Sequence, residues 1–452
     1  MDQSTFVYNA YKLSPDHKRA DFTYTTHIKQ ESFDFTESYV FAKPLPDSLE
    51  THRLLKMLHL ASGISYYKLF FNTDIEHPYA MSTSESHFWN TVFKNGLGEF
   101  MYVNNLSADN LAVFGPQEGH DSPTNERIQL QPKALLGIGG GKDSIVAGQL
   151  LKSIGIDVDG FIMATGNATA QAAEVAKTMR VGTHIVERHF DMSLVPLQSR
   201  PDAYKGHIPI SLLFATVGSL LAVSMGYSYV VVANESSSSI PRASHNGEAV
   251  NHQWSKSFEA EKLVQNYLHS HVNSDLWYFS AIRPLSSVAV AKIFCSYPQY
   301  FNVFTSDNFG FRVQADKRPT SRWSTESPKS LSSYILLSAW LNQDQLMTIF
   351  GQDFLNNADL QQLFLELTGI EGEPPLDCVG TPEELRASLG KAYAKGNFHD
   401  SILMQLALQK GIVAEDRHIA PTVEQLLSPS TEHNLPPALA QRILTKLTEE
   451  IS

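Results

Sequence analysis

The chain has 452 residues, 42% of them hydrophobic and 10% aromatic, which is enough for two or three globular domains with substantial cores. Its net charge of −12 at pH 7 argues against binding nucleic acid through a broad basic face. The two cysteines, Cys295 and Cys378, lie far apart and give neither a disulfide framework nor a metal-binding spacing. This composition predicts a globular protein of a reducing compartment.

Two segments bear on where the protein resides. Residues 1–24 carry charges throughout and lack the apolar core of a signal peptide, so we expect a cytoplasmic protein. Residues 208–227 are uncharged, over a length that suits a bilayer span of roughly 20 residues. They contain several Ser, Thr and Gly residues and lead into a second apolar run, which favours a buried helix before a central strand.

Residues 1–130 have the pattern of an α+β domain. Alternating apolar residues predict strands at 22–26 and 33–41, and the spacing at 49–61 predicts an amphipathic helix. The aromatic stretch at 64–71 is interpreted as core rather than as the wall of a ligand site. A polar segment at 115–125 is rich in Pro, Gly, Ser and Asp and indicates the domain boundary.

The remainder of the chain is predicted to form two further regions. Residues 131–300 alternate between strand and helix patterns, which predicts an α/β domain with a parallel sheet and helices on both faces. Residues 301–452 are predicted to be mainly helical. The predicted strands end at Ile138 and span 158–164, 183–187 and 229–233; the predicted helices span 144–154, 170–180, 208–225, 331–341, 343–350, 359–367, 382–394, 399–408 and 436–448.

A glycine-rich segment, GGGKDS at 139–144, follows the first strand of the α/β domain. Three glycines leave backbone N–H groups unobstructed, and the helix start adds partial positive charge, so this loop suits an anion such as a polyphosphate. Leu136 and Asp143 break the Walker A pattern, and Lys142 breaks the dinucleotide-binding fingerprint. A tight turn without a ligand is the alternative.

Polar or glycine-rich loops occur at four points of this domain, at 139–144, 165–167, 204–209 and 234–239. In open α/β sheets, ligands bind beyond the carboxyl ends of the strands. We therefore expect these four loops to meet at one edge of the sheet.

Several side chains in this domain could carry chemistry. Asp143 is the best candidate for contact with Mg²⁺, and its alternative role is a helix N-cap. Glu235 follows a strand end and could share the metal, bind substrate or lie at the surface. The segment 247–257 is dense in hydrogen-bonding groups, and His252 and Lys256 would share one face of a helix there. His252 is interpreted either as a structural residue or as a substrate or proton-transfer group.

The glycine loop resembles the PP-loop of the ATP pyrophosphatase superfamily, written SGGxDS, with Gly139 in place of the first Ser. The resemblance implies an α/β domain of the adenine nucleotide α-hydrolase type, which holds the β,γ-diphosphate of ATP and transfers AMP. The implied ATP contacts are Gly139, Gly140, Gly141, Lys142, Asp143, Ser144, Ala164 and Thr165.

A set of short motifs covers most of the chain: LHLASGISYYK at 58–68, GLGEF at 96–100, GHIP at 206–209, ANES at 233–236, GEAVNHQWSK at 247–256, RPLS at 283–286, IFG at 349–351 and CVG at 378–380. Together with GGGKDS they resemble the UDP-N-acetylmuramoyl-L-alanyl-L-glutamate epimerase family. This resemblance implies an isomerase that inverts the terminal L-Glu of a UDP-muramoyl dipeptide in peptidoglycan precursor synthesis.

The family resemblance also implies ATP and Mg²⁺ dependence, with adenylation of the glutamate carboxylate and release of diphosphate and AMP. It implies no nucleic-acid or membrane partner and leaves the oligomeric state open. Proton-transfer groups are expected among His252, Lys256, His207 and Glu235. Substrate contacts are expected from Asn234, Arg242, Asn251, Gln253, Trp254 and Arg283.

One segment departs from the family pattern, in which a four-cysteine cluster follows the sheet domain. The four cysteine positions are occupied here by Asp307, Ser324, Ser327 and Ser330. Because a serine hydroxyl stays protonated and is a poor zinc ligand, we expect no structural Zn²⁺. Another form of packing must then close this segment.

Two other functions are compatible with the sequence. The first is another PP-loop adenylating reaction, either amide ligation or thiolation of a tRNA base; thiolation typically needs catalytic cysteines, and neither Cys295 nor Cys378 lies near a predicted strand end. The second is a non-catalytic nucleotide-binding module, against which the intact GGGKDS and NHQWSK motifs argue.

Overall fold

A computed structural model describes residues 4–117, 128–164, 168–307, 321–413 and 421–452. It has a mixed α/β fold with a large, mostly parallel sheet and a helical C-terminal region. The sheet has nine strands, hydrogen-bonded in the order β11-β8-β5-β6-β7-β3-β2-β1-β4. The α/β class predicted from the sequence is thereby confirmed at this level.

Contacts divide the chain into two compact units, and the chain passes between them several times. Unit 1 comprises Met1–Leu135, His184–Val231 and Pro241–Phe279. Unit 2 comprises Leu136–Thr183, Val232–Ile240 and Ser280–Ser452. The three consecutive domains expected from the sequence stay a prediction.

Unit 1 contains an antiparallel set of strands with one buried face. β1 (Ser4–Leu13), β2 (Arg19–Ile28) and β3 (Glu31–Phe41) pair in order, and β4 (Asp74–Glu76) pairs parallel to β1. β3 also pairs antiparallel with β7 (Gly182–His189). The alternating burial along β2 is what a strand with one face on the core requires. These N-terminal strands therefore extend the sheet instead of forming a separate one.

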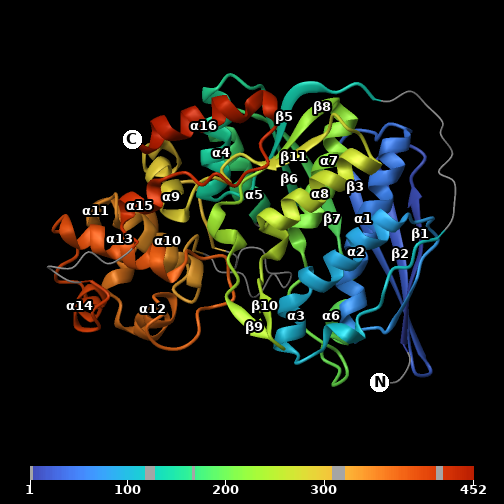
Figure 1. The fold of residues 1–452 in the computed structure, drawn as a ribbon, viewed down its shortest axis with the longest axis horizontal. Helices are drawn as coiled ribbons and strands as arrows, with labels where there is room; N and C mark the ends of the chain where they lie inside the picture. The colour runs from blue at the N-terminus through green and yellow to red at the C-terminus, as the bar shows by residue number, and fades with distance from the viewer. Residues whose placement is uncertain (1–3, 118–127, 165–167, 308–320, 414–420) are drawn as a thin grey trace. The chain divides into compact units, whose positions relative to one another are not determined.

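Helix α1 (Leu49–Phe70) covers β1 and β2, as Figure 1 shows, and also packs on α7. It extends past the helix predicted at 49–61 and contains most of the aromatic stretch, whose interpretation as core is confirmed by the full burial of Tyr66 and Tyr67. Gly63 allows the close packing, because a Cβ there would lie 2.3 Å from the Tyr8 ring. α1 is thus the central helix of unit 1.

A buried ion pair joins β3 to β7 within unit 1. The Arg188 Nε donates to Glu37 Oε1 at 2.7 Å, and both side chains are almost fully buried. Tyr39 and Tyr66 donate their hydroxyl protons to the same carboxylate at 2.7 and 2.9 Å. The Arg188 guanidinium also lies 3.9 Å from the centre of the Phe190 ring. Each oxygen of Glu37 therefore has a partner, as a buried charge requires.

The long uncharged segment of the sequence forms helix α7 and part of the loop before it. Among the described residues, no helix combines the length and hydropathy needed to cross a membrane. The other helices and strands of unit 1 are α2 (Thr83–Gly96), α3 (Gly98–Val103), α6 (Leu194–Leu197), α7 (Ile210–Met225), β8 (Tyr227–Val232), β9 (Ala243–His245), β10 (Glu248–Val250), α8 (Phe258–His271) and β11 (Trp277–Ser280), with the last residues of β8 and β11 in unit 2.

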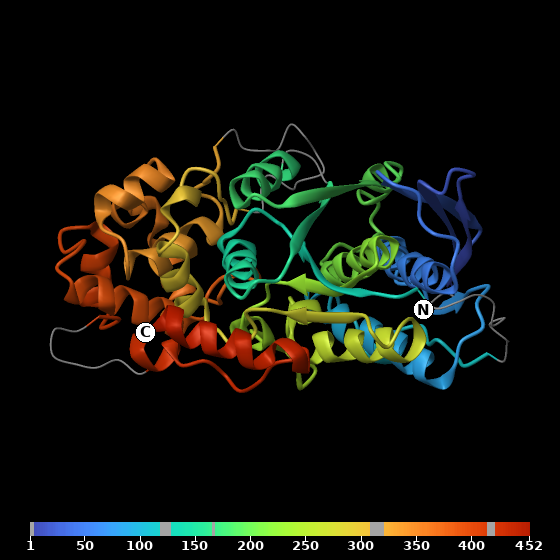
Figure 2. The ribbon, with the colours of Figure 1, turned by 90° about the horizontal axis from the view of Figure 1, so that it is seen from above.

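Unit 2 combines part of the parallel strands with the C-terminal helices, which run from orange to red in Figure 2. Helix α10 contacts α9, α11, α12 and α13. The predicted bounds 158–164, 343–350 and 382–394 match β6, α11 and α13. Its elements are β5 (Gln131–Gly137, beginning in unit 1), α4 (Lys142–Ser153), β6 (Val158–Ala164), α5 (Ala168–Met179), α9 (Ser287–Cys295), α10 (Pro328–Ser338), α11 (Gln343–Phe350), α12 (Gln361–Leu367), α13 (Pro382–Ala394), α14 (Ile402–Gln409), α15 (Val423–Leu427) and α16 (Pro437–Ile451).

The buried pair makes a prediction about stability. Glu37→Ala leaves the Arg188 guanidinium buried without its carboxylate, so we expect the free energy of unfolding to fall by about 3–5 kcal/mol. Urea unfolding followed by circular dichroism measures this loss. As a control on the same strand, Glu31→Ala removes an exposed partner of Arg200 and should have a much smaller effect. Equal losses for the two variants would contradict this account.

Candidate functional site

The glycine loop of unit 2 joins β5 to α4. Gly140 has φ +91°, a conformation that favours glycine, and its carbonyl accepts a hydrogen bond from the Thr305 N–H at 3.1 Å. A Cβ at Gly139 would meet no atom within 4 Å, so the space above this residue is open. The loop is held from one side and accessible from another.

The N-terminus of α4 has no side-chain cap. Gly141 occupies the N-cap position, and because it has no side chain it cannot accept from the first backbone N–H groups of the helix. The Ser144 hydroxyl donates to the Gly141 carbonyl at 3.0 Å instead of capping an amide. The proposed N-cap role of Asp143 is therefore wrong, because Asp143 is the second residue of the helix. A helix start of this kind favours an anion.

Lys142 and Asp143 put one positive and one negative charge at this helix start. The Lys142 Nζ lies 2.7 Å from Asp143 Oδ1, with the lysine side chain 8% and the aspartate side chain 31% exposed. Burial lowers the pKa of Lys142, but the nearby carboxylates of Asp143, Glu235 and Glu384 outweigh it and raise this pKa. Lys142 thus stays a cation, and the role of Glu235 stays a prediction.

The loop after β8 is fixed to the chain that follows β11. Asn234 and Ser280 exchange two hydrogen bonds, at 2.9 and 2.7 Å. Arg283, which is 1% exposed, donates through one guanidinium nitrogen to the Glu235 carbonyl at 2.8 Å and to the Ser238 hydroxyl at 2.9 Å. The sequence led us to expect that Arg283 contacts substrate. In the structure its side chain binds the loop after β8.

Glu384, at the start of α13, binds the same loop. Its Oε1 accepts from the Ser237 hydroxyl and from the Ser287 N–H, both at 2.7 Å. Its Oε2 accepts from the Thr381 N–H at 2.8 Å, which completes the capping box of α13. Burial raises the pKa of Glu384, and these three donors oppose that rise.

The positions where the family pattern has cysteines gather around Asp307 in unit 2. Asp307 Oδ2 accepts from the Ser324 N–H at 2.9 Å and from the Ser330 hydroxyl at 3.3 Å, while Ser327 is fully buried. The Asp307 N–H donates to the Thr305 hydroxyl. Hydrogen bonds to one carboxylate thus close this segment. In the described part of the chain, no three His, Cys, Asp or Glu side chains are grouped to hold a metal ion.

A second group of polar residues lies in unit 1, around the loop before α7. Lys68 of α1 donates from Nζ to the Gly206 carbonyl, and the Glu99 carboxylate of α3 accepts from the His207 N–H at 2.6 Å. Burial lowers the pKa of Lys68 to about 8, and the Glu99 carboxylate opposes this shift. Lys68 can therefore lose or gain a proton near neutral pH.

The dense polar segment 247–257 also belongs to unit 1. Residues Trp254–Lys256 form a short 3-10 turn, so the helical face expected to present His252 and Lys256 together does not form. The Trp254 indole donates to Glu259 at 2.9 Å, and the Ser255 hydroxyl accepts from the Ser211 N–H at 3.4 Å. The segment is therefore packed against the start of α7.

The other residues expected at the site have varied surroundings. His252 and Gln253 are buried, whereas Arg242 and Asn251 are partly exposed, and all four lie in unit 1. The Gln253 N–H donates to the Asn251 side chain at 3.0 Å. Ala164 is the last residue of β6 in unit 2. Thr165, with the whole loop 165–167, lies outside the described residues.

Family comparisons agree with the motifs. The chain matches the model of the MurL N-terminal domain over residues 1–281 and that of the MurL C-terminal domain over residues 303–419. It belongs to the MurL family. Glu384 and the Asp307 cluster lie in the C-terminal MurL domain, and the glycine loop, Lys68 and His252 lie in the N-terminal one.

Curated relatives resemble the chain over most of its length. Proteins named UDP-N-acetyl-alpha-D-muramoyl-L-alanyl-L-glutamate epimerase occur in Salinispora tropica (30% identical over 89% of this chain and 87% of the relative) and in Xanthomonas oryzae pv. oryzae (28%, 89% and 88%). A relative of the same name from Micromonospora sp. is 28% identical over 97% of both chains.

The structure adds residues of this MurL chain that the sequence analysis did not single out. Lys68 and Glu99 lie within two of the quoted motifs, YYK and GEF, so the signal was present but gave no reason to prefer them over their neighbours. Glu384 had the signal of a capping box, Thr381 followed by Glu384, which describes a helix start and not a site. Their roles depend on partners distant in sequence.

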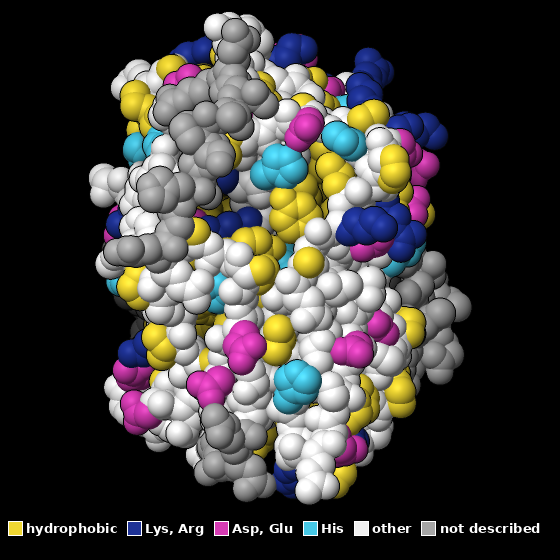
Figure 3. Space-filling view, turned by 90° about the vertical axis from the view of Figure 1, so that its right-hand side faces the viewer, with side chains coloured by type: hydrophobic (Ala, Val, Ile, Leu, Met, Phe, Trp, Pro, Cys, Tyr) yellow, Lys and Arg dark blue, Asp and Glu magenta, His cyan; other side chains and the backbone are white. Residues whose placement is uncertain are grey.

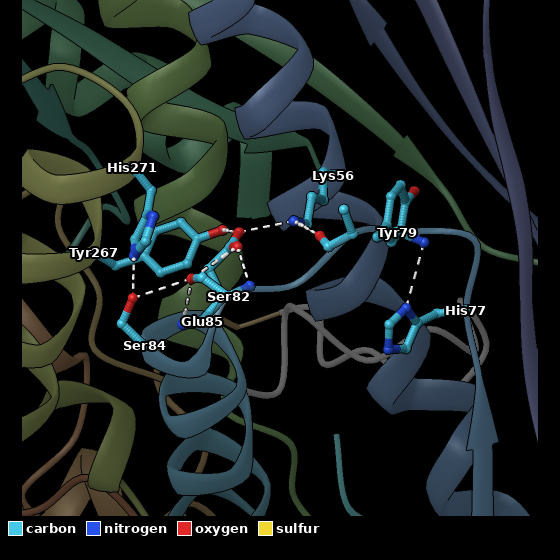
Figure 4. Close-up of polar contacts among 9 residues, drawn as sticks. Lys56, His77, Tyr79, Ser82, Ser84, Glu85, Tyr267 and His271 are labelled. Carbon is cyan, nitrogen blue, oxygen red and sulfur yellow. Dashed lines mark hydrogen bonds and ion pairs between the residues drawn. The ribbon is translucent and has the colours of Figure 1, made fainter. Parts of the chain in front are cut away.

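A second lysine of α1 shows how different the surroundings of Lys68 are. Lys56 lies 2.7 Å from Glu85 Oε1 and donates to the Ala80 carbonyl, as Figure 4 shows. Tyr267 of α8 donates to the same Glu85 oxygen at 3.4 Å, so this cluster connects α1, α2 and α8. Lys56 has a carboxylate in direct contact, whereas Lys68 is bonded to a neutral carbonyl. The Lys56 cluster is therefore interpreted as structural.

One face of the molecule shows the distribution of surface charge. In Figure 3, Lys and Arg side chains stand among Asp and Glu side chains over the visible described surface. The chain as a whole carries a net charge of −12.

The surroundings of Lys68 make a prediction about its titration. After methylation of the lysines with ¹³C-formaldehyde, we expect one NMR signal to titrate near pH 8 and to be missing in Lys68→Met. Because the pKa in the folded state is below the ordinary value of 10.5, the unfolded state binds more protons between these values. The free energy of unfolding should therefore rise as the pH rises from about 8 to 10.5, and it should rise less in Lys68→Met. A midpoint near 10.5 would contradict the prediction; Lys56→Met is the matched control.

Proposed function

We propose that this chain is an ATP-dependent epimerase that inverts the terminal L-glutamate of UDP-N-acetylmuramoyl-L-alanyl-L-glutamate. Membership of the MurL family and three relatives named for this epimerase support the isomerase activity and the substrate. The protein would thus act in peptidoglycan precursor synthesis, on a small molecule in the cytoplasm.

The observation that carries the ATP dependence is the uncapped start of α4 after three glycines. Four backbone N–H groups at a helix start need acceptors, and a diphosphate supplies them together with the charge that the helix dipole favours. The buried Lys142 ammonium adds a fixed cation. These features support the assignment of residues 139–144 as a PP-loop for the β,γ-diphosphate.

The residues at this loop also fit Mg²⁺. Mg²⁺ commonly takes one or two carboxylates and completes its coordination with phosphate oxygens and water. Asp143, with its partly exposed carboxylate, would supply one ligand, and Glu235 acts on the same loop electrostatically. Mg²⁺ would neutralise phosphate charge as diphosphate leaves.

ATP is consumed to make the glutamate Cα–H bond acidic. An oxygen of the glutamate α-carboxylate attacks the α-phosphorus of ATP. The bond from that phosphorus to the bridging oxygen breaks, which releases diphosphate. The mixed anhydride lacks the carboxylate charge that would oppose ionisation, so a base can remove the Cα proton and the electron pair enters an enolate. An acid returns a proton to the opposite face, and water then cleaves the anhydride to the D-glutamate product and AMP.

The chain offers several groups for these proton transfers. The candidates from the sequence are His207, His252, Lys256 and Glu235. Lys68 is added because its pKa near 8 suits both the giving and the taking of a proton at neutral pH.

The decisive experiment is an incubation with ATP, Mg²⁺ and the UDP-muramoyl-L-alanyl-L-glutamate substrate in D₂O. We expect AMP and diphosphate, D-glutamate on chiral analysis after hydrolysis, and deuterium at Cα. Release of ADP in place of AMP would overturn the adenylation route. AMP without Cα deuterium would point to a different adenylating enzyme, and failure to cleave ATP would point to a non-catalytic module.

A variant of the loop tests the site. Asp143→Asn removes the carboxylate proposed to bind Mg²⁺, so we expect kcat for AMP release to fall by about 100-fold or more. Stopped assays of AMP over a range of Mg²⁺ concentrations measure this loss. Glu174→Gln, which alters an exposed pair with Lys177 on α5, is the control and should retain activity. Full activity of Asp143→Asn would remove Asp143 from the site.

A further inference from the structure

The buried carboxylate of Glu384 makes more contacts than its place in the helix requires. As the third residue of α13, it needs only to receive the N–H of Thr381 in order to complete the capping box. Such a residue usually lies at the surface, yet Glu384 is 3% exposed. Its second oxygen accepts two further donors, Ser237 and the amide of Ser287. These additional contacts need an explanation.

The two additional donors belong to segments next to the proposed nucleotide loop. Ser237 is in the short 3-10 turn Ser236–Ser239, which follows Glu235 directly. Ser287 is the first residue of α9, and α9 packs against α4, the helix that begins at the glycine loop. One carboxylate therefore holds the β8 loop and the α9 start at a common point.

The same loop is bound from its other side by Arg283. The guanidinium of Arg283 contacts the Glu235 carbonyl and the Ser238 hydroxyl, so residues 235, 237 and 238 each have a partner from elsewhere in unit 2. Glu384 and Arg283 together leave the backbone of Glu235 little freedom. The orientation of that residue is thus set by groups far from it in sequence.

We propose that Glu384, supplied by the C-terminal MurL domain, is a positioning residue of the nucleotide site that fixes the Glu235–Ser239 loop. This inference rests on the proposed ATP site. It gives the C-terminal domain a direct part in nucleotide binding, because a side chain of α13 sets the geometry beside the glycine loop.

The test measures binding of α,β-methylene-ATP with Mg²⁺ by isothermal titration calorimetry, with folding of each variant checked by circular dichroism at the same temperature. Glu384→Ala removes three acceptor contacts, and we expect the Kd to rise by about tenfold or more. Glu384→Gln can keep one oxygen on Ser237 and Ser287 and should raise the Kd by less. Glu383→Gln, on the same helix with an exposed pair to Arg386, should bind within about twofold of the parent.

A double-mutant cycle separates positioning from general destabilisation. If Glu384 acts through Ser237, the effects of Ser237→Ala and Glu384→Ala on the Kd should be non-additive, because each variant removes the same hydrogen bond. Additive effects, or a folded Glu384→Ala that binds within about twofold of the parent, would overturn this inference alone. If Glu384→Ala does not fold, Ser237→Ala carries the test by itself, and a Kd within about twofold of the parent for that variant would overturn the inference. Failure of the parent to bind would overturn the proposed nucleotide site and this inference together.

Discussion

The structure of unit 1 depends on the desolvated pair between Glu37 and Arg188. Removing two charges from water costs several kcal/mol for each ion, and hydrogen bonds to the remaining atoms lower that cost. Here Tyr39 and Tyr66 complete the carboxylate. The pair lies where β3 meets β7, so the antiparallel N-terminal strands can continue the sheet in one register. The α1 helix, which supplies Tyr66, is fixed to the same point.

Buried polar contacts also fix a loop of unit 2. The sheet supplies strand ends, but strand ends alone do not set the direction of the loops that follow. Arg283 and Glu384 do so with buried polar contacts to the loop after β8. The glycine loop leads into α4, whose N-terminus has no side-chain cap. Uncapped backbone N–H groups cost free energy, and a bound anion would remove that cost. Arg283 and Glu384 thus fix the loop after β8, whereas the N-terminus of α4 has no side-chain cap.

The sequence predicted those features that have a local cause. The glycine run, the strand at 158–164 and the helices at 343–350 and 382–394 follow from periodicity and end signals, and the structure has them at the predicted bounds. The helix over His252 and Lys256 was wrong, because packing of Ser255 on α7 favours a short 3-10 turn. The partners of Arg283, Lys68 and Glu384 could not be predicted, since they come from residues 45 to 147 positions away. No pattern within a single segment carries that information.

The cluster around Asp307 has a consequence for the chemistry this chain can withstand. Cysteine thiolates are converted by peroxide to sulfenic and higher acids, and a segment closed by them would open under such stress. A carboxylate with seryl and amide donors has no oxidisable atom of that kind. Of the two thiols that the chain retains, Cys295 has its pKa raised to about 12 by burial, which keeps it protonated and unreactive. The Asp307 cluster therefore offers a thiol-oxidising agent no sulfur atom to attack.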